Sequence, residues 1–277
     1  MENYIKNRYD FVFLYDVKDG NPNGDPDMDN QPRIDFETRE GLVSDVCIKR
    51  KIRNYIQLKV EAGELSADKY DIFIRQGNIL NNIINSAKEE ADNDEEKGRL
   101  SMCKKYYDVR TFGAVLNTGS KLGVVRGPVQ LVFSRSADPI DSRTHSLTRC
   151  CVVESADSTT FGSKSTVSYG LYRMHGYVSA FDGAKCNFTE EDLSLLWEAL
   201  SNAFEHDHSA ARGEMNARAL IVFKHESKLG NARSSELFNL VKIEKKEGVE
   251  FPRQYEDYIV TVDKSAAPKG VSIEELI

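Results

Sequence analysis

Three basic side chains near the start of a predicted helix are the first candidates for chemistry. Lys49, Arg50 and Arg53 follow Ser44 in the segment SDVCIKRKIRNYI. Residues three and four apart share one side of a helix, so the three cations are expected to cluster. Such a cluster can bind consecutive phosphates, and the Ser44 hydroxyl with the free N–H groups of the helix start also suits an anion. The pattern predicts contact with a nucleic-acid backbone; a solvated basic face with a serine cap would have the same spacing.

An aspartate-rich loop, NPNGDPDMDN, is a candidate for metal binding. Asp25, Asp27 and Asp29 match the first three ligand positions of an EF-hand loop. The match then fails, because Asn30 stands where the turn glycine belongs and Phe36 where the bidentate Glu belongs. A structural loop is favoured over calcium, and magnesium for a nuclease remains the alternative.

Other catalytic signatures are incomplete. FGSKST resembles the end of a phosphate-binding loop, but Ser163 replaces the glycine before the lysine, and no G-x-S-x-G elbow occurs. His206 and His208 could bind zinc, although they follow a helix end, where capping or packing is the simpler role. The five cysteines form no C-x-x-C pair. We therefore expect no enzymatic activity, no metal and no cofactor.

Charge is unevenly distributed along the chain, whose net charge is −7. Residues 16–37 carry seven acids and two bases, whereas residues 99–135 carry seven bases and one acid. Since screening limits electrostatic interactions to roughly 10 Å, the local field decides phosphate affinity. A basic groove on an acidic body is possible, and ordinary solvated surface charge is the alternative.

Length and composition predict a soluble protein with its own core. The chain has 277 residues, 40% of them hydrophobic, and no run of 18 apolar residues. Its first residues contain no apolar signal segment. A reduced, intracellular setting without membrane contact is expected, because the odd number of cysteines suggests no disulfide framework.

Six segments form the predicted framework of a single α+β domain. Leaving insertions aside, they are strand 10–17, helix 44–60, strand 127–135, strand 170–181, helix 189–205 and strand 217–225. This is the split βαβ order of ferredoxin-like domains, which RNA recognition motifs also use. Two late strands are expected within 236–245 and 257–263.

Both predicted helices have an apolar side. In the first, the shared side is expected to hold Val46, Ile52, Tyr55, Ile56 and Val60. The second begins at Thr189 with Asp192 as a capping-box partner. Its core side is expected to hold Leu193, Leu196, Trp197, Leu200 and Phe204. Base stacking is therefore not expected of Trp197.

Two further stretches are predicted to be insertions. Residues 61–126 contain helical patches and a charged run, which is typical of a helical insertion. Residues 136–170 are rich in Ser, Thr and Gly and are expected to form a long projecting hairpin. Its candidates for partner contact are Arg143, His145, Arg149, Phe161 and Lys164. A long loop without a role is the alternative.

Several motifs together resemble one family. These are GNPNGDPD, QPRID, GLVSDVCIKRKIRNYI, DVRTFGAVL, RGPVQ, YGLYRMHGY, FEHDHSAARGEM and FKHESKLGN. They are similar to the backbone subunit of type I CRISPR surveillance complexes (Cascade), subtype I-C, over about residues 8–245. The resemblance implies an RNA-recognition-like palm with a finger insertion (61–126) and a thumb hairpin (136–170). It also implies a non-catalytic protein of the prokaryotic cytoplasm.

The resemblance assigns roles to particular residues. The family pattern S-x-x-x-x-K-R-x-x-R falls on Ser44, Lys49, Arg50 and Arg53, which would contact guide phosphates. Arg39, Lys121 and Arg126 join the residues expected to bind RNA, and the basic 99–135 region would line the guide channel or a path for target DNA. Phe112 could contact RNA or only pack the palm.

The implied partners are CRISPR RNA, target DNA through guide pairing, other copies of the chain and the other Cascade subunits. In a head-to-tail row, the acidic face from Asp25 to Glu37 could meet a basic edge of the next copy. Two other functions remain open. One is a metal-dependent ribonuclease subunit, as in type III complexes, and the other is a scaffold that binds only protein.

Overall fold

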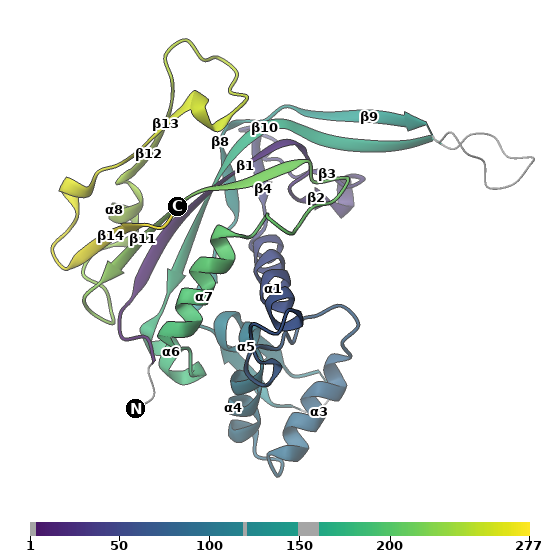
Figure 1. Cartoon of the computed structure of the whole chain (residues 1–277), viewed down its shortest axis with the longest axis vertical. Helices are drawn as coiled ribbons and strands as arrows, with labels where there is room; N and C mark the ends of the chain where they lie inside the picture. The colour runs from purple at the N-terminus through teal and green to yellow at the C-terminus, as the bar shows by residue number, and fades with distance from the viewer. Residues whose placement is uncertain (1–3, 119–120, 149–160) are drawn as a thin grey trace, which may run out of the picture.

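A long hydrophobic strand, β1, lies in the middle of an antiparallel sheet (Figure 1). The computed structural model describes residues 4–118, 121–148 and 161–277. Within them the sheet has eight strands in the order β14-β11-β1-β10-β8-β4, and β7 and β9 also pair with β10. Its strands are β1 (Tyr9–Gly20), β4 (Glu40–Val43), β7 (Val129–Leu131), β8 (Ser134–Pro139), β9 (Ser142–Thr148), β10 (Phe161–Val178), β11 (Glu214–His225) and β14 (Val271–Glu275). The expected α+β class is confirmed.

Residues of β1 alternate between two hydrophobic cores, because successive side chains of a strand point to opposite faces. Phe11, Phe13 and Tyr15 enter the core on one face, and Val12 and Leu14 enter the core on the other. A strand that is buried on both faces has an uninterrupted run of apolar residues, which explains why the segment DFVFLYDV predicts a strand.

Two helices, α1 (Asp45–Glu61) and α7 (Glu190–Ser201), cover one face of the sheet. The capping box of α7 is present: Thr189 accepts from the Asp192 backbone N–H, and Asp192 accepts from that of Thr189. Trp197 packs edge-on against Phe11 with ring centroids 5.0 Å apart, in line with a core role. The nearby α6 (Ala180–Cys186) precedes α7.

The inward side of α1 differs in part from the prediction. Ile48, Ile52 and Ile56 recur every fourth residue and are fully buried. Val46 is 62% exposed, because it lies six residues before Ile52 and therefore about 120° around the helix. Lys51 is buried on this helix although it is charged. It pairs with Asp207 in the loop after α7.

The C-terminal segment covers the opposite face of the sheet. It comprises α8 (Ser234–Phe238), the hairpin of β12 (Val241–Lys245) and β13 (Tyr258–Val262), two short 3-10 turns (Tyr255–Asp257 and Lys264–Ala266) and β14. Leu237, Phe238 and Tyr258 pack here against Leu14 and Phe223. The two late strands are confirmed, except that residues 236–238 end α8.

Residues 61–126 form a largely helical body with its own hydrophobic cluster, below the sheet in Figure 1. Phe73, Ile84, Met102 and Leu116 belong to that cluster. Its elements are α2 (Ala67–Tyr70), α3 (Leu80–Glu90), α4 (Glu95–Lys105), α5 (Tyr107–Phe112), β5 (Gly113–Leu116) and β6 (Gly123–Arg126). Among the described helices, none combines the length and the apolar character needed to cross a membrane.

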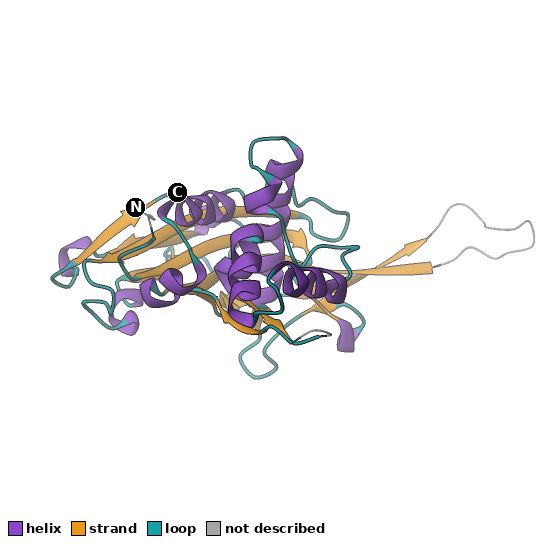
Figure 2. Ribbon diagram, turned by 90° about the horizontal axis from the view of Figure 1, so that it is seen from below, coloured by secondary structure: helices purple, strands orange, loops and turns teal. Residues whose placement is uncertain are grey.

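A two-stranded arm projects from the sheet (Figure 2). It consists of β9 and the first half of β10, paired from Phe161↔Thr148 to Val167↔Ser142. Val167 also pairs with Gly20 of β1, so β10 passes from the arm into the sheet without a break. Arg149, Cys150 and Cys151 lie outside the described residues.

Candidate nucleic-acid interface

Two of the three predicted phosphate-binding cations of α1 lie around one aromatic ring. The Lys49 Nζ is 5.5 Å from the centroid of the Phe112 ring, and the Arg53 Cζ is 5.3 Å from it. Lys49 also pairs with Asp45 one turn earlier, with Nζ and Oδ2 2.9 Å apart. Phe112 is 8% exposed, so it packs beneath these cations and presents little surface to a ligand.

Arg53 joins α1 to the 61–126 body. Its Nε donates to the Asp108 carboxylate across 2.8 Å, and the two side chains are 11% and 1% exposed. Asp108 also accepts hydrogen bonds from the backbone N–H groups of Phe73 and Ile74. Arg53 therefore neutralises a buried carboxylate, which leaves it little freedom to bind phosphate.

Arg50 faces a groove of about 830 Å³ beside α1. Its Nη1 donates to the Ile74 carbonyl oxygen across 2.7 Å, and burial together with the neighbouring Arg53 charge lowers its pKa. The groove is lined by Arg50, Asn54, Gln57, Leu58, Arg75, Gln76, His206 and Arg212. None of these described lining residues is acidic.

Three elements build the walls of this groove. Residues 50, 54, 57 and 58 lie on one side of α1, as their helical spacing requires. Arg75 and Gln76 come from the turn after α2. Arg50 holds this turn against α1 by donating to the Ile74 carbonyl oxygen, and Arg53 holds it through Asp108, which accepts from the Ile74 N–H. His206 and Arg212 come from the loop after α7. Guanidinium and amide groups can donate hydrogen bonds to phosphate and ribose oxygens, which are the same at every position of the sequence.

Ser44 stabilises the fold instead of facing the groove. It is the N-cap residue of α1, but its side chain makes no capping hydrogen bond. Its hydroxyl and its backbone N–H both donate to Asn23 Oδ1, at 2.8 and 2.9 Å. The amide of the GNPNG motif occupies this hydroxyl, so the predicted contact with an anion would require this hydrogen bond to break.

The remaining predicted RNA contacts are dispersed. Arg39 is exposed and lines a small cavity of about 230 Å³ near the arm. Lys121 is exposed between β5 and β6, and Arg126 is 3.5 Å from Asp182. On the arm, Arg143 pairs with Asp141 at 2.7 Å and His145 Nε2 is 3.2 Å from Thr166 Oγ1. Phe161 is 73% exposed and Lys164 is half-buried.

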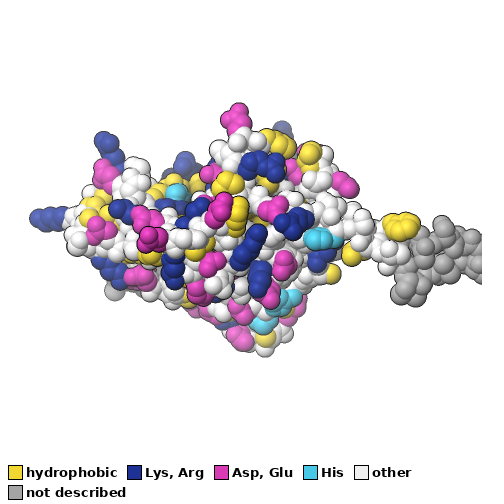
Figure 3. All heavy atoms as spheres, turned by 90° about the horizontal axis from the view of Figure 1, so that it is seen from above, with side chains coloured by type: hydrophobic (Ala, Val, Ile, Leu, Met, Phe, Trp, Pro, Cys, Tyr) yellow, Lys and Arg dark blue, Asp and Glu magenta, His cyan; other side chains and the backbone are white. Residues whose placement is uncertain are grey.

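The 99–135 region is not a continuous basic surface. Arg110 is 2% exposed and pairs with buried Asp192 of α7 at 2.7 Å. Arg135 pairs with Asp35 and Glu40, and this contact lowers the pKa of Asp35. The acidic segment is thus partly neutralised within its own chain. Figure 3 shows Lys and Arg side chains intermixed with Asp and Glu over the face seen there.

The aspartate-rich loop is organised by hydrogen bonds within the protein. Asp25 caps the short turn Pro26–Met28 and pairs with Arg33 at 3.4 Å. Asp27 and Asp29 are exposed. Over the described residues, no group of three or more His, Cys, Asp or Glu side chains is placed to hold a metal ion.

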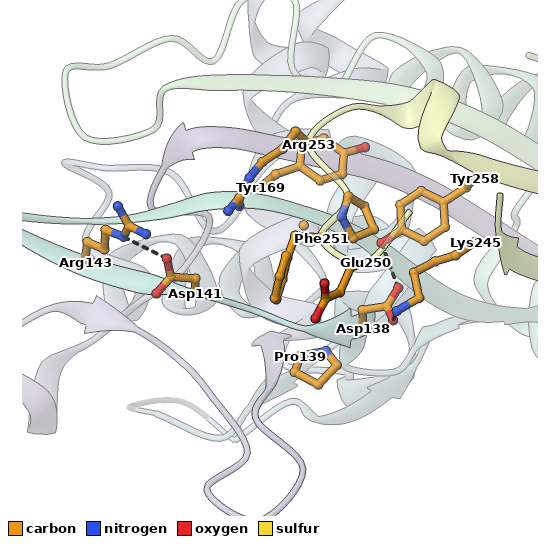
Figure 4. Close-up of a pocket in the computed structure, with 12 residues that line it drawn as sticks. Asp138, Pro139, Asp141, Arg143, Tyr169, Lys245, Glu250, Phe251, Arg253 and Tyr258 are labelled. Carbon is orange, nitrogen blue, oxygen red and sulfur yellow. Dashed lines mark hydrogen bonds and ion pairs between the residues drawn. The ribbon is translucent and has the colours of Figure 1, made fainter. Parts of the chain in front are cut away.

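A second cavity, of about 640 Å³, lies between the base of the arm and the C-terminal segment (Figure 4). Its acids are Asp138, Asp141 and Glu250, and its cations are Arg143, Lys245 and Arg253. Asp138 is held by Lys245 at 3.0 Å and by the Tyr258 hydroxyl at 2.9 Å. Because its charges balance, this cavity is less suited to a polyanion than the groove beside α1.

Of the eight residues that line the groove, only Arg50 was predicted from the sequence to bind RNA. Arg75 and Gln76 carry no local signal, since the contacts that place them come from α1 and α5. Arg212 and His206 belong to the motif FEHDHSAARGEM, in which the roles considered for His206 were zinc binding, capping or packing, and Arg212 had no role beyond the family resemblance. Their proximity to Arg50 depends on the packing of α7 beside α1 on one face of the sheet.

Comparisons with known proteins identify the family. The family described as "CRISPR-associated protein Cas7" matches residues 7–263. A CRISPR-associated protein Cas7 of Haloferax volcanii is 24% identical over 271 residues, covering 86% of this chain and 75% of the relative. The fold is similar to a chain of a "CRISPR RNA-guided surveillance complex, pre-nicking" (11% identity, 78% of each chain, TM-score 0.51). A chain of a second "CRISPR RNA-guided surveillance complex" is 13% identical over 77% of this chain and 68% of its own length, with a TM-score of 0.44. The chain belongs to the Cas7 family of CRISPR-associated proteins.

Proposed function

We propose that this Cas7 protein is a backbone subunit of a type I-C surveillance complex that binds the phosphate backbone of CRISPR RNA without sequence preference. The observation that carries the proposal is the groove beside α1, whose described lining contains Arg50, Arg75, Arg212 and His206 and no acidic residue. Several copies would line one RNA and leave guide bases free to pair with target DNA. The other Cascade subunits would complete the complex in the prokaryotic cytoplasm.

The element order supports a division into palm, finger and thumb. Four strands in the order β11-β1-β10-β7, with α1 and α7 on one face, correspond to a ferredoxin-like palm. In this proposal residues 61–126 are the finger, and residues 136–170, which include the β9–β10 arm, are the thumb. The C-terminal segment covers the sheet face that RNA recognition motifs use for stacking, so RNA would lie on the helical side.

Nucleic-acid binding is tested on the full chain. Protein purified without nuclease is expected to have a high absorbance ratio of 260 to 280 nm, because RNA copurifies with a backbone subunit. The nuclease-treated protein should then bind a fluorescein-labelled single-stranded RNA, with an affinity that falls as salt rises. A scaffold that binds only protein would show neither property.

We propose that the subunit has no catalytic activity of its own. The exposed carboxylates Asp27 and Asp29 are the residues that a metal-dependent ribonuclease of the type III kind would use, which makes this alternative testable. The RNA-loaded assembly is incubated with complementary RNA and magnesium. Regularly spaced cleavage products that disappear in Asp27→Asn would establish the ribonuclease; intact RNA supports the non-catalytic subunit.

A further inference from the structure

The loop after α7 contains an ion pair at the edge of the groove. Arg212 Nη1 lies 2.5 Å from Asp207 Oδ1 and also donates to the Asp207 carbonyl oxygen at 3.1 Å. The Asp207 side chain is 9% exposed, whereas that of Arg212 is 35% exposed and lines the groove. Arg212 Nε and Nη2 make no hydrogen bond to the described residues, so three N–H donors of the guanidinium remain for a ligand.

Asp207 is itself fixed from below by a buried lysine. Lys51 of α1, whose side chain is 2% exposed, pairs with Asp207 Oδ2, and its Nζ lies 5.4 Å from the centroid of the Phe204 ring. A buried ammonium requires a counter-charge. The carboxylate of Asp207 therefore lies between two cations, one in the core and one at the groove.

The backbone of this loop is held independently of these charges. A Cβ added to Gly20 at the end of β1 would lie 1.7 Å from the Arg212 carbonyl oxygen, so only glycine permits this close approach. Gly213 has φ +61°, and the Asn21 N–H donates to the Ala211 carbonyl oxygen at 2.8 Å. What the Asp207 carboxylate adds is the direction of the Arg212 side chain.

We propose that Asp207 is a positioning residue for RNA binding: its carboxylate, anchored by Lys51, aims the Arg212 guanidinium into the groove toward a phosphate. The inference rests on the proposed function. An acid beside a phosphate site lowers the affinity for RNA by repulsion unless it orients a cation. Removal of the Asp207 carboxylate should therefore weaken RNA binding if Asp207 positions Arg212, and should strengthen binding if Asp207 is only a nearby negative charge. Guanidinium binding to phosphate is directional, and a preformed orientation reduces the entropy lost on binding.

The test is a double-mutant cycle on the full chain, made with Lys51 present and repeated with Lys51→Met, where Asp207→Asn leaves no buried ammonium without a partner. Arg212→Gln, Asp207→Asn and their combination are titrated with a fluorescein-labelled single-stranded RNA of mixed sequence at several salt concentrations. Lys228→Gln, an exposed cation beyond the opposite end of β11, is the matched control. Thermal unfolding checks that every variant is folded.

Arg212→Gln is expected to weaken binding about tenfold and to reduce the salt slope by about 0.7. Asp207→Asn should weaken binding severalfold while Arg212 is present and should not weaken it once Arg212 is Gln. Equal weakening in both backgrounds indicates loop stabilisation, and strengthening in both indicates a bystander charge; either result overturns the proposal. If Arg50→Gln weakens binding and Arg212→Gln does not, only the positioning role fails. If neither does, the groove itself is not the RNA site.

Discussion

Arg53 of α1 and Asp108 of α5 form an ion pair of 2.8 Å in which the carboxylate is 1% exposed. Arg53→Met is expected to lower the free energy of unfolding by about 3 kcal/mol, because Asp108 keeps two backbone donors but loses its counter-charge. Lys49→Met, which removes an i,i+4 pair whose Asp45 carboxylate is 24% exposed, should cost only about 0.5 kcal/mol. Urea unfolding of both variants checks this, and similar losses would contradict the structural role of Arg53.

Arg75 offers a direct test of the groove. Its side chain is 41% exposed and its ion pair with Asp71 is long, at 3.4 Å, so its removal should leave stability nearly unchanged. Arg75→Gln is expected to reduce the slope of log affinity against log salt by about 0.7 for single-stranded RNA. Fluorescence anisotropy measures the slope, with Lys228→Gln as control. A slope equal to that of the unmodified protein would exclude Arg75 from the interface.

Asp27 and Asp29 allow the acidic face to be tested. Both are exposed, so Asp27→Asn with Asp29→Asn should change the free energy of unfolding by less than about 0.5 kcal/mol. If this face contacts a basic edge of the next copy, fewer copies of the double variant than of the unmodified protein should bind one RNA at low salt. Mass photometry counts the copies. Glu244→Gln with Glu247→Gln, two exposed acids of the C-terminal segment, is the charge-matched control; undiminished assembly of the loop variant would refute the contact.

Phe161 is 73% exposed at the start of β10. An aromatic side chain held in solvent by a hairpin is expected to contact a partner, so Phe161→Ser should reduce assembly on RNA without loss of stability. Leu229→Ser, at a residue 76% exposed elsewhere, should have no effect on assembly. Analytical ultracentrifugation of both variants with RNA makes the comparison, and identical profiles would remove Phe161 from the interface.

His175 predicts a pH dependence of stability. Its ring stacks on Phe238 at 3.9 Å and accepts a hydrogen bond from Arg173, and burial together with the Arg173 charge lowers its pKa to about 4. In the unfolded chain the His175 imidazole is protonated near pH 6.5, whereas in the folded chain it stays neutral down to about pH 4. The stability that the neutral ring contributes is therefore complete above pH 6.5 and is lost as the pH falls toward 4. The loss should be smaller than that of a fully buried imidazole, because solvent screens the charge on a partly exposed ring.

The variant His175→Gln keeps a hydrogen-bond acceptor but does not titrate. Its stability should fall less than that of the unmodified protein between pH 6.5 and 4, as measured by urea unfolding at each pH. His208→Gln, at an exposed position, should retain the original profile. If the stability of His175→Gln and that of the unmodified protein fall equally with pH, His175 is not the source of the pH dependence.

The main strands and helices could be predicted because each depends on a pattern among residues that are close in sequence. Three such patterns are the apolar run of β1, the isoleucines of α1 at every fourth residue and the Thr189–Asp192 cap of α7. Each can be recognised from a few consecutive residues. Strands β4 and β14 were missed, since EGLV and VSIEE each contain only two apolar residues and neither lies within a longer apolar segment. Each is an edge strand defined by its partner.

The site was predictable only in part, because sequence shows charges but not their partners. Arg50 does face the groove, whereas Arg53 and Arg110 are neutralised by Asp108 and Asp192, 55 and 82 positions away. Lys51 is buried and pairs with Asp207, and no local pattern distinguishes it from its neighbours Lys49 and Arg50. A basic cluster read from a helix therefore mixes ligand-binding residues with those that stabilise the fold.

The continuity of β10 has a mechanical meaning. Because one strand of 18 residues serves both the sheet and the arm, with Val167 paired to both Gly20 and Ser142, no hinge separates them. At about 3.3 Å per residue the strand spans roughly 60 Å. The arm is therefore a rigid extension of the sheet, and any partner that binds it is held at a distance and an angle that the twist of the sheet determines.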